Sequence, residues 1–176
     1  NEITTLPRLL DMINIKGSVV TGDAMYCQKD VCKQLVKAKA DYILSLKRNH
    51  EHLYDDVKLW LDTQFDSGNL PINETVDKDH GRIEVRRYAL STKIDWLDNK
   101  SDWTGLSAVA MVDSTRIIGE DSHTERRYYL TSLTDLPIVA QYIRSHWAIE
   151  NSQHWVLDVT FGEDRSVKLE KNARSN

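Results

Sequence analysis

Apolar positions recur along the chain at two spacings, and the order in which these alternate predicts an α/β protein. Apolar residues three or four positions apart indicate helices over residues 3–14, Gln28–Lys39 and, further on, Leu53–Leu61. Short apolar runs at Ser18–Gly22 and Asp41–Leu46 indicate buried strands. Helix, strand, helix and strand at these lengths predict an α/β unit with parallel strands and a right-handed crossover.

The middle of the chain has the pattern of β-strands. Strand-like segments are expected at Ile83–Leu90, Ser107–Asp113, Arg116–Ile118 and Thr124–Leu130. Gly81, Gly105 and Gly119 lie between or next to these segments and suggest antiparallel hairpins. We therefore expect residues 1–49 to form the first part of the core and residues 50–136 to form a mostly β insertion.

A long helix is expected to close the fold, from Pro137 to about Leu157, within a last core segment at residues 137–162. A polar stripe of residues spaced by four follows this helix: His146, Glu150, His154 and Asp158. Acidic and imidazole side chains on a half-buried face are costly unless a cation is bound or paired there, which makes the stripe a candidate site. The alternative is a solvated helix face. Residues 163–176 are expected to be an exposed tail.

Composition limits the class of protein and its partners. The chain is 40% hydrophobic and 28% charged, which is ordinary for a globular domain. A net charge of −4 argues against a protein that coats nucleic acid, although it permits a local basic groove. Cys27 and Cys32 are expected to be reduced packing residues. No run approaches the roughly 18 apolar residues of a membrane span and no secretory leader is seen, so we expect a cytoplasmic protein.

Asp23 stands directly after the first expected strand, and strand carboxyl ends are where ligands and catalytic groups gather in α/β sheets. With Asp23 there and Glu150 on the late helix, the chain resembles DDE transposases of bacterial insertion sequences, and more narrowly the branch of the H-repeat-associated proteins. Five segments in the family's order carry this resemblance: Asn1–Thr4, Val20–Gln28, Leu46–Asn49, His80–Arg87, and His146–Asn151 through Trp155–Val159.

The resemblance implies a partial ribonuclease-H-like domain, in which three carboxylates hold two divalent ions, usually Mg²⁺ with Mn²⁺ as the alternative. Two metals about 4 Å apart can activate the attacking oxygen and stabilise the leaving oxygen of phosphodiester cleavage. Asp23 and Glu150 match the second and third carboxylates and are the implied catalytic, metal-ligating residues. The first carboxylate is expected upstream of Asn1, in a longer polypeptide of which this chain would be the carboxyl-terminal portion.

The resemblance also implies DNA as the partner, at the transposon ends and at the target. Contacts to DNA are expected from Lys47, His80, Arg82, Arg86, Arg87 and His146. Side chains expected to support the metal site are Asn151, His154 and Asp158.

Two smaller questions stay open at this stage. On a strand, Arg82 and Arg86 would share one face while Arg87 points to the other, so this segment is either a DNA contact or a surface strand with cross-strand charge pairs. His50 and His52 could be metal ligands, but no third ligand is visible near them.

Three functions agree with the sequence. The first is the catalytic portion of a DDE transposase, whose intact form cuts donor DNA by metal-dependent hydrolysis and joins it to target DNA. The second is a catalytically inactive remnant with at most DNA or partner binding. The third is a related nuclease, because hydrolysis and transfer use the same carboxylates. A sheet without its first strands would leave a strand edge unpaired, so we expect a homodimer, a swap of elements or marginal stability.

Overall fold

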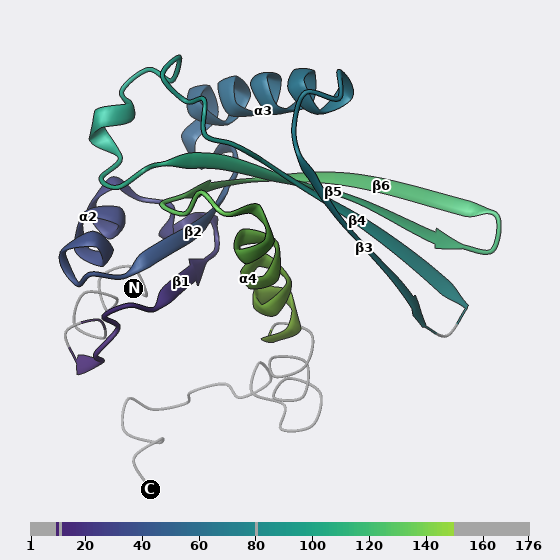
Figure 1. Ribbon diagram of the computed structural model, residues 1–176, viewed down its shortest axis with the longest axis horizontal. Helices are drawn as coiled ribbons and strands as arrows, with labels where there is room; N and C mark the ends of the chain where they lie inside the picture. Colours follow the sequence, from purple (N-terminus) through teal and green to yellow (C-terminus); the bar gives the residue numbers. More distant parts are fainter. Residues whose placement is uncertain (1–9, 11, 80, 150–176) are drawn as a thin grey trace, which may run out of the picture. The chain divides into compact units, whose positions relative to one another are not determined.

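The computed structural model describes residues 10, 12–79 and 81–149 (Figure 1). Its strands are β1 (Val19–Gly22), β2 (Asp41–Leu46), β3 (Ile72–Asp79), β4 (Arg82–Ser91), β5 (Ala108–Ile118) and β6 (Asp121–Thr131). Its helices are α2 (Lys29–Lys37), α3 (Glu51–Asp66) and α4 (Leu136–Ile149), with short 3-10 helices η1 (Ala24–Tyr26), η2 (Arg48–His50) and η3 (Lys100–Asp102). The expected helix over residues 3–14 falls largely outside the described residues.

The predicted parallel pair of strands is confirmed. β1 and β2 pair in parallel, with Gly22 opposite Leu44, and α2 connects them. A Cβ atom at Gly22 would lie 3.0 Å from Cδ2 of Leu44 and 3.2 Å from Cβ of Tyr26, so a larger residue would have to displace these side chains. The helix ends at Lys37, two residues earlier than expected, because Lys39 adopts the left-handed conformation with φ of 59°.

The remaining strands continue the same sheet in antiparallel fashion. The six strands follow the order β1-β2-β6-β5-β4-β3, and β6 joins the antiparallel part to β2. The separate strands expected at Ser107–Asp113 and Arg116–Ile118 are one strand, β5, because Ser114 and Thr115 keep their pairing with both neighbours. The hairpin turns expected at Gly81 and Gly119 are confirmed, each with a positive φ.

β3 was not expected from the sequence. It forms the edge of the sheet and pairs along its whole length with β4. Its apolar residues Ile72 and Val76 are about half exposed, at 48% and 52%. An edge strand without a buried face lacks the alternation of apolar and polar residues that marks a strand in a sequence, which explains why the pattern missed it.

The main core lies between one face of the sheet and the helices α2 and α3. It is formed by buried residues of both helices, of four strands, of the connection between β4 and β5, and by Cys27, which precedes α2: Cys27, Val31, Cys32, Leu35, Tyr42, Leu44, Leu46, Val57, Leu61, Ala89, Ile94, Leu97, Trp103, Leu106, Val109, Met111, Tyr128 and Leu130. Residues that alternate with these along the strands, such as Ile43, Ala110 and Tyr129, are buried too. Both faces of the central strands are therefore covered.

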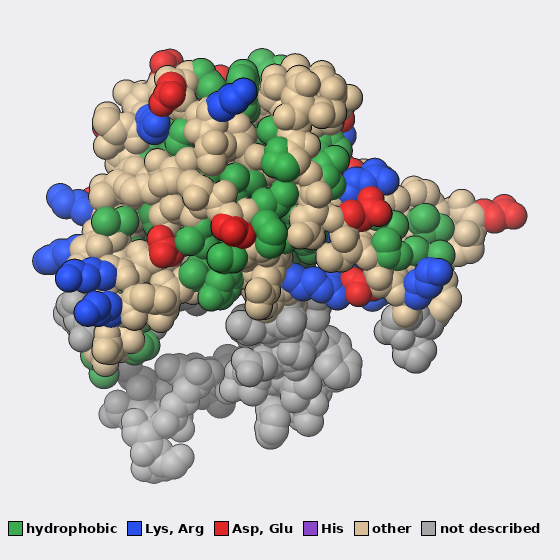
Figure 2. Space-filling view, viewed as in Figure 1, with side chains coloured by type: hydrophobic (Ala, Val, Ile, Leu, Met, Phe, Trp, Pro, Cys, Tyr) green, Lys and Arg blue, Asp and Glu red, His purple; other side chains and the backbone are tan. Residues whose placement is uncertain are grey.

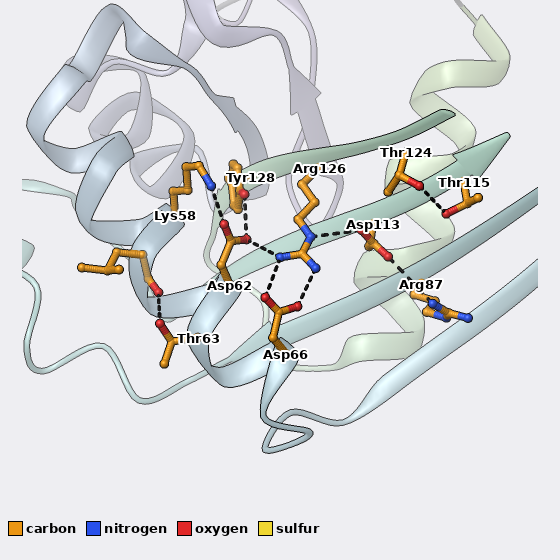
Figure 3. A network of polar contacts seen from close by, with 11 residues as sticks. Lys58, Asp62, Thr63, Asp66, Arg87, Asp113, Thr115, Thr124, Arg126 and Tyr128 are labelled. Atoms are coloured by element: carbon orange, nitrogen blue, oxygen red, sulfur yellow. Dashed lines mark hydrogen bonds and ion pairs between the residues drawn. The ribbon is translucent and has the colours of Figure 1, made fainter. Parts of the chain in front are cut away.

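A network of ion pairs ties the end of α3 to the sheet (Figure 3). The Arg126 guanidinium on β6 contacts carboxylates of Asp113 at 3.1 Å, Asp62 at 3.1 Å and Asp66 at 2.5 Å. Burial raises the pKa of Asp62, but hydrogen bonds from Lys58, Tyr128 and Arg126 outweigh it, and the pKa lies below its ordinary value. The hydrogen bonds from Arg126 likewise lower the pKa of Asp66. The network explains why α3 extends to Asp66, beyond the expected Leu61.

The closing helix begins as expected. The Asp135 carboxylate accepts the backbone N–H of Ile138 at 3.0 Å, which caps α4, and Pro137 occupies its first turn. The described part of α4 ends at Ile149, so its expected course to Leu157 lies outside the described residues. The chain divides into two compact units at residues 142 and 143. Among the described helices, none combines the length and apolar character needed to cross a membrane.

Candidate functional site

Asp23 lies where the sequence pattern predicts it, directly after β1, and its side chain is exposed. It precedes η1, whose first turn is closed by a hydrogen bond from the Tyr26 N–H to the Asp23 carbonyl at 2.9 Å. Lys47 directly follows β2 and is also exposed. Because β1 and β2 are adjacent parallel strands, Asp23 and Lys47 follow strand ends at the same edge of the sheet.

The segment after β2 holds the turn that carries Asp23. The side-chain amide of Asn49 donates a hydrogen bond to the Ala24 carbonyl at 2.9 Å. The His50 ring contacts the Cys27 carbonyl through Nε2 at 2.6 Å. Sequence reasoning gave neither residue this role, although Asn49 belongs to a segment that carried the family resemblance. Both contacts span more than twenty residues of chain, so no local pattern could have predicted them.

A cavity of about 310 Å³ opens beside this turn. It is lined by residues of α2, η2, α3 and the segment before β5: Lys29, His50, Glu51, His52, Leu53, Asp56, Asp98, Asn99 and Trp103. His50 packs edge-on against Trp103, with ring centroids 5.2 Å apart. Within the part of the chain that the structure describes, no three His, Cys, Asp or Glu side chains are arranged to hold a metal ion. His50 and His52 therefore have no third metal ligand among these residues.

Several expected site residues lie outside the described residues. These are Glu150, Asn151, His154 and Asp158, which were expected on the late helix, and His80. His146 is described, half-buried on α4. Of the four residues in the expected polar stripe, only His146 is therefore among the described residues.

The arginines of β4 have carboxylate partners on the same sheet. Arg86 contacts Asp77 at 2.5 Å and Glu84 at 2.6 Å, and Arg82 lies 3.9 Å from the same glutamate. On the other face, Arg87 contacts Glu74 at 2.8 Å. The expected division of these side chains between two faces is confirmed by the pairing of β4. The cross-strand charge pairs that were the alternative for this segment are therefore present.

The two cysteines are packing residues. Cys27 and Cys32 are free thiols and fully buried. Burial, with a smaller contribution from the neighbouring Cys32, raises the pKa of Cys27 to about 12. Burial raises the pKa of Cys32 to about 11. Because the reactive form of cysteine is the thiolate, neither thiol is suited to nucleophilic or redox chemistry at neutral pH.

Comparison with known proteins gives the family. The chain matches the family model described as "Transposase DDE domain" over residues 1–175. It is 44% identical over 137 residues to "Uncharacterized protein in dhlA 3'region" of Xanthobacter autotrophicus, covering 78% of this chain and 46% of that protein. It is 37% identical over 184 residues to "Putative transposase YncI" of Escherichia coli O157:H7, covering 98% and 46%.

A third relative supports the narrower resemblance. The chain is 36% identical over 177 residues to "H repeat-associated putative transposase YhhI" of Escherichia coli (strain K12), covering 93% of this chain and 45% of that protein. The chain thus spans about half the length of these curated relatives. No solved structure matches it. The resemblance expected from the sequence is confirmed, and the chain belongs to the family of transposases with a DDE domain.

Proposed function

We propose that this chain is part of a DDE transposase that cuts DNA and transfers the cut strand in transposition of an insertion sequence. The observation that carries the proposal is an exposed aspartate, Asp23, at the carboxyl end of a parallel strand in a chain of this family. The α/β unit at residues 1–49 and the closing helix at 137–162 would form part of a ribonuclease-H-like core. The mostly β segment at 50–136 would extend the core sheet, and residues 163–176 would be its tail.

Asp23 and Glu150 are the proposed ligands of the divalent ions of the family. Carboxylate oxygens are the ligands that Mg²⁺ prefers, and the exposed carboxylate of Asp23 fits that requirement. Two bound Mg²⁺ or Mn²⁺ ions would supply charge stabilisation to the attacking and leaving oxygens of the phosphodiester. Asn151, His154 and Asp158 would orient Glu150. A further carboxylate would come from polypeptide outside this chain, since its relatives are about twice as long.

Divalent-ion binding tests this proposal directly. In calorimetric or electron-paramagnetic titration, the chain should bind Mn²⁺, and Asp23→Asn and Glu150→Gln should each weaken the binding about tenfold or more, because a ligand oxygen loses its charge. Asp30→Asn is the matched control, because Asp30 is an exposed aspartate in the first turn of α2.

The second candidate function, an inactive remnant, predicts a different titration. Such a protein would bind no Mn²⁺, or would bind it with an affinity that Asp23→Asn leaves unchanged. Either result would contradict the proposed metal site.

DNA is the proposed substrate, and basic side chains of this chain would contact its phosphates. Lys47 stands at the same sheet edge as Asp23 and is exposed, which suits a phosphate contact. His80, His146 and the β4 arginines Arg82, Arg86 and Arg87 are further candidates, although the carboxylates beside these arginines weaken their field. Because these arginines are already paired with carboxylates, other basic side chains are the stronger candidates for phosphate contacts.

A lysine row on α2 is a second basic surface. Lys29, Lys33 and Lys37 are exposed and spaced by four residues, so they follow one face of the helix. Figure 2 shows Lys and Arg side chains gathered over the side of this view where α2 lies. Lys29 pairs with Asp102 at 2.7 Å, whereas Lys33 and Lys37 have no ion pair with any described residue. We include the latter two among the proposed phosphate contacts.

The salt dependence of DNA binding tests this surface. Removal of one charge that contacts a phosphate should reduce the slope of log K against log salt concentration by about 0.9, so Lys33→Gln combined with Lys37→Gln should reduce it by about 2. Lys29→Gln is the matched control on the same helix, because its charge is already paired with Asp102. An unchanged slope in the double variant, or an equal change in the control, would remove α2 from the interface. The measurement is fluorescence anisotropy with duplex DNA at several salt concentrations.

Self-association is also part of the proposal. β1 forms one edge of the sheet, and its outer edge has no strand partner among the described residues. An unpaired strand edge favours pairing with another strand, either from the longer polypeptide or from a second copy in a homodimer. Since the relatives are bacterial and DNA is the proposed substrate, the proposed location is the bacterial cytoplasm.

A further inference from the structure

We infer that Asn49 is a positioning residue for Asp23, an inference that rests on the proposed role of Asp23 as a metal ligand. Asn49 does not belong to the set of carboxylates and basic side chains considered above. It is exposed, lies in η2 after β2, and reaches the turn after β1 through its side-chain amide. The juxtaposition of the two turns follows from the parallel pairing of β1 and β2.

The turn that carries Asp23 is short, and its internal hydrogen bonds lie within Asp23–Gln28. η1 contains three residues, and 3-10 helices of this length have few and poorly aligned hydrogen bonds. The Asp23 side chain does not cap η1, and the backbone of the turn sets the position from which its carboxylate extends. The two ends of the turn differ in how firmly they are held. The far end is anchored because Cys27 is fully buried in the core, whereas Asp23 at the near end is exposed.

Asn49 acts at the exposed end of the turn. Its amide nitrogen lies 2.9 Å from the carbonyl oxygen of Ala24, the residue next to Asp23. The same carbonyl accepts the Cys27 N–H at 3.1 Å, so both of its lone pairs are used. Because a carbonyl only accepts, the contacting atom of Asn49 must be its NH₂ group, which fixes the orientation of the amide. The hydrogen bond links the peptide beside Asp23 to the neighbouring strand end.

His50 supports the other end of the same turn. Its Nε2 lies 2.6 Å from the Cys27 carbonyl, and its ring packs edge-on against Trp103, which is buried. Consecutive residues of η2 thus hold the first and the last carbonyl of the Ala24–Cys27 segment. Since burial already anchors Cys27, removing the His50 contact leaves that end in place. Removing the Asn49 contact releases the end that bears the metal ligand.

Supporting contacts of this kind matter to a metal site because ligand oxygens must be held in place before the ion arrives. Loss of the groups that orient metal ligands typically costs about 10- to 100-fold in metal affinity. Asn49 touches neither the ion nor the DNA in this account and acts through the backbone beside Asp23. The segment Leu46–Asn49, which helped to carry the family resemblance, thereby acquires two functions: a phosphate contact at Lys47 and a backbone clamp at Asn49.

The experiment compares Asn49→Ala with Asn69→Ala and Asp23→Asn in this chain. Asn69 is the control because its side chain is also exposed and makes one hydrogen bond, to Gln64 at 3.3 Å. Asn49→Ala should weaken Mn²⁺ binding about tenfold or more and leave the melting temperature within the range of the control. It should also speed deuterium exchange of the Tyr26 and Cys27 amides, while amides of β5 stay protected.

The outcomes separate this inference from the function on which it rests. If Asp23→Asn weakens Mn²⁺ binding and Asn49→Ala does not, or if exchange in the turn is unchanged, the positioning role is wrong while the metal site stands. If Asp23→Asn itself has no effect, the metal site fails and the inference falls with it. Weaker Mn²⁺ binding and faster local exchange in Asn49→Ala, neither seen in Asn69→Ala, support the inference.

Discussion

Arg126→Met is expected to lower the free energy of unfolding by about 3 kcal/mol, which corresponds to a fall in melting temperature of roughly 6–12 °C for a chain of this size. The Arg126 guanidinium is the shared partner of Asp62, Asp66 and Asp113. The Asp113 side chain is 7% exposed, so the substitution leaves a buried carboxylate whose next cation, on Arg87, is 3.9 Å away. Methionine keeps the apolar stem and removes the guanidinium charge together with its hydrogen bonds to Asp113 and Asp66. Thermal and urea denaturation measure the effect.

Arg127→Met is the matched control, because Arg127 is the next residue on β6 and forms a surface ion pair with Glu125 at 2.7 Å. Such pairs contribute about 0.2–1 kcal/mol, so the control should change stability little. Equal losses in the two variants would show that the Arg126 network does not anchor α3.

The pH dependence gives the same prediction a second readout. The folded-state pKa values of Asp62 and Asp66 are lowered, so their contribution to stability is present above the unfolded pKa of about 3.9 and is lost as pH falls through the folded values. The stability difference between wild type and Arg126→Met should therefore be largest near pH 7 and shrink below about pH 4.

The parts of the fold that the sequence predicted are those that local patterns encode. β2 is a run of apolar residues that is buried on both faces, and α2 repeats its apolar residues Val31 and Leu35 at helical spacing. Both signals are contained in a few consecutive residues, and so is the position of Asp23 after β1. Elements whose stability comes from distant partners were harder to predict. β3 depends on contacts with β4, such as Glu74 with Arg87, rather than on a buried face of its own.

The same distinction applies to the candidate site. The resemblance pointed to the charged side chains of Asp23, Lys47 and the arginines of β4, because these residues lie in the segments that carry it. It left open whether these arginines contact DNA or pair with carboxylates, and it did not identify Asp77 and Glu74, which lie on another strand, as partners of Arg86 and Arg87. Nor did it assign a role to Asn49, whose contact with the Ala24 carbonyl depends on the pairing of two strands. Three-dimensional neighbours, rather than residue types, decide these roles.

In a polypeptide of the relatives' length that contains this chain, Asp23→Asn is expected to slow DNA cleavage by about 1,000-fold or more. The stabilisation that bound ions give to the charged oxygens of the reaction is worth several kcal/mol, and each 1.36 kcal/mol corresponds to about a factor of ten in rate. Asparagine keeps the size of the side chain and removes the negative charge that would hold the ion. Cleavage and joining of a labelled DNA duplex, with Mg²⁺ or Mn²⁺ present, measure the effect.

Two comparisons make this result specific to the metal site. Asp30→Asn, at an exposed aspartate of α2, should retain cleavage, and Asp23→Asn should bind DNA with an unchanged salt slope because Asp23 carries no positive charge for a phosphate. The products separate a transposase from a related nuclease, since only a transposase joins the cut end to a second duplex, while both lose cleavage in Asp23→Asn. Cleavage that survives Asp23→Asn would mean that the catalytic carboxylates lie elsewhere in the polypeptide, and that the aspartate after β1 has no part in the reaction.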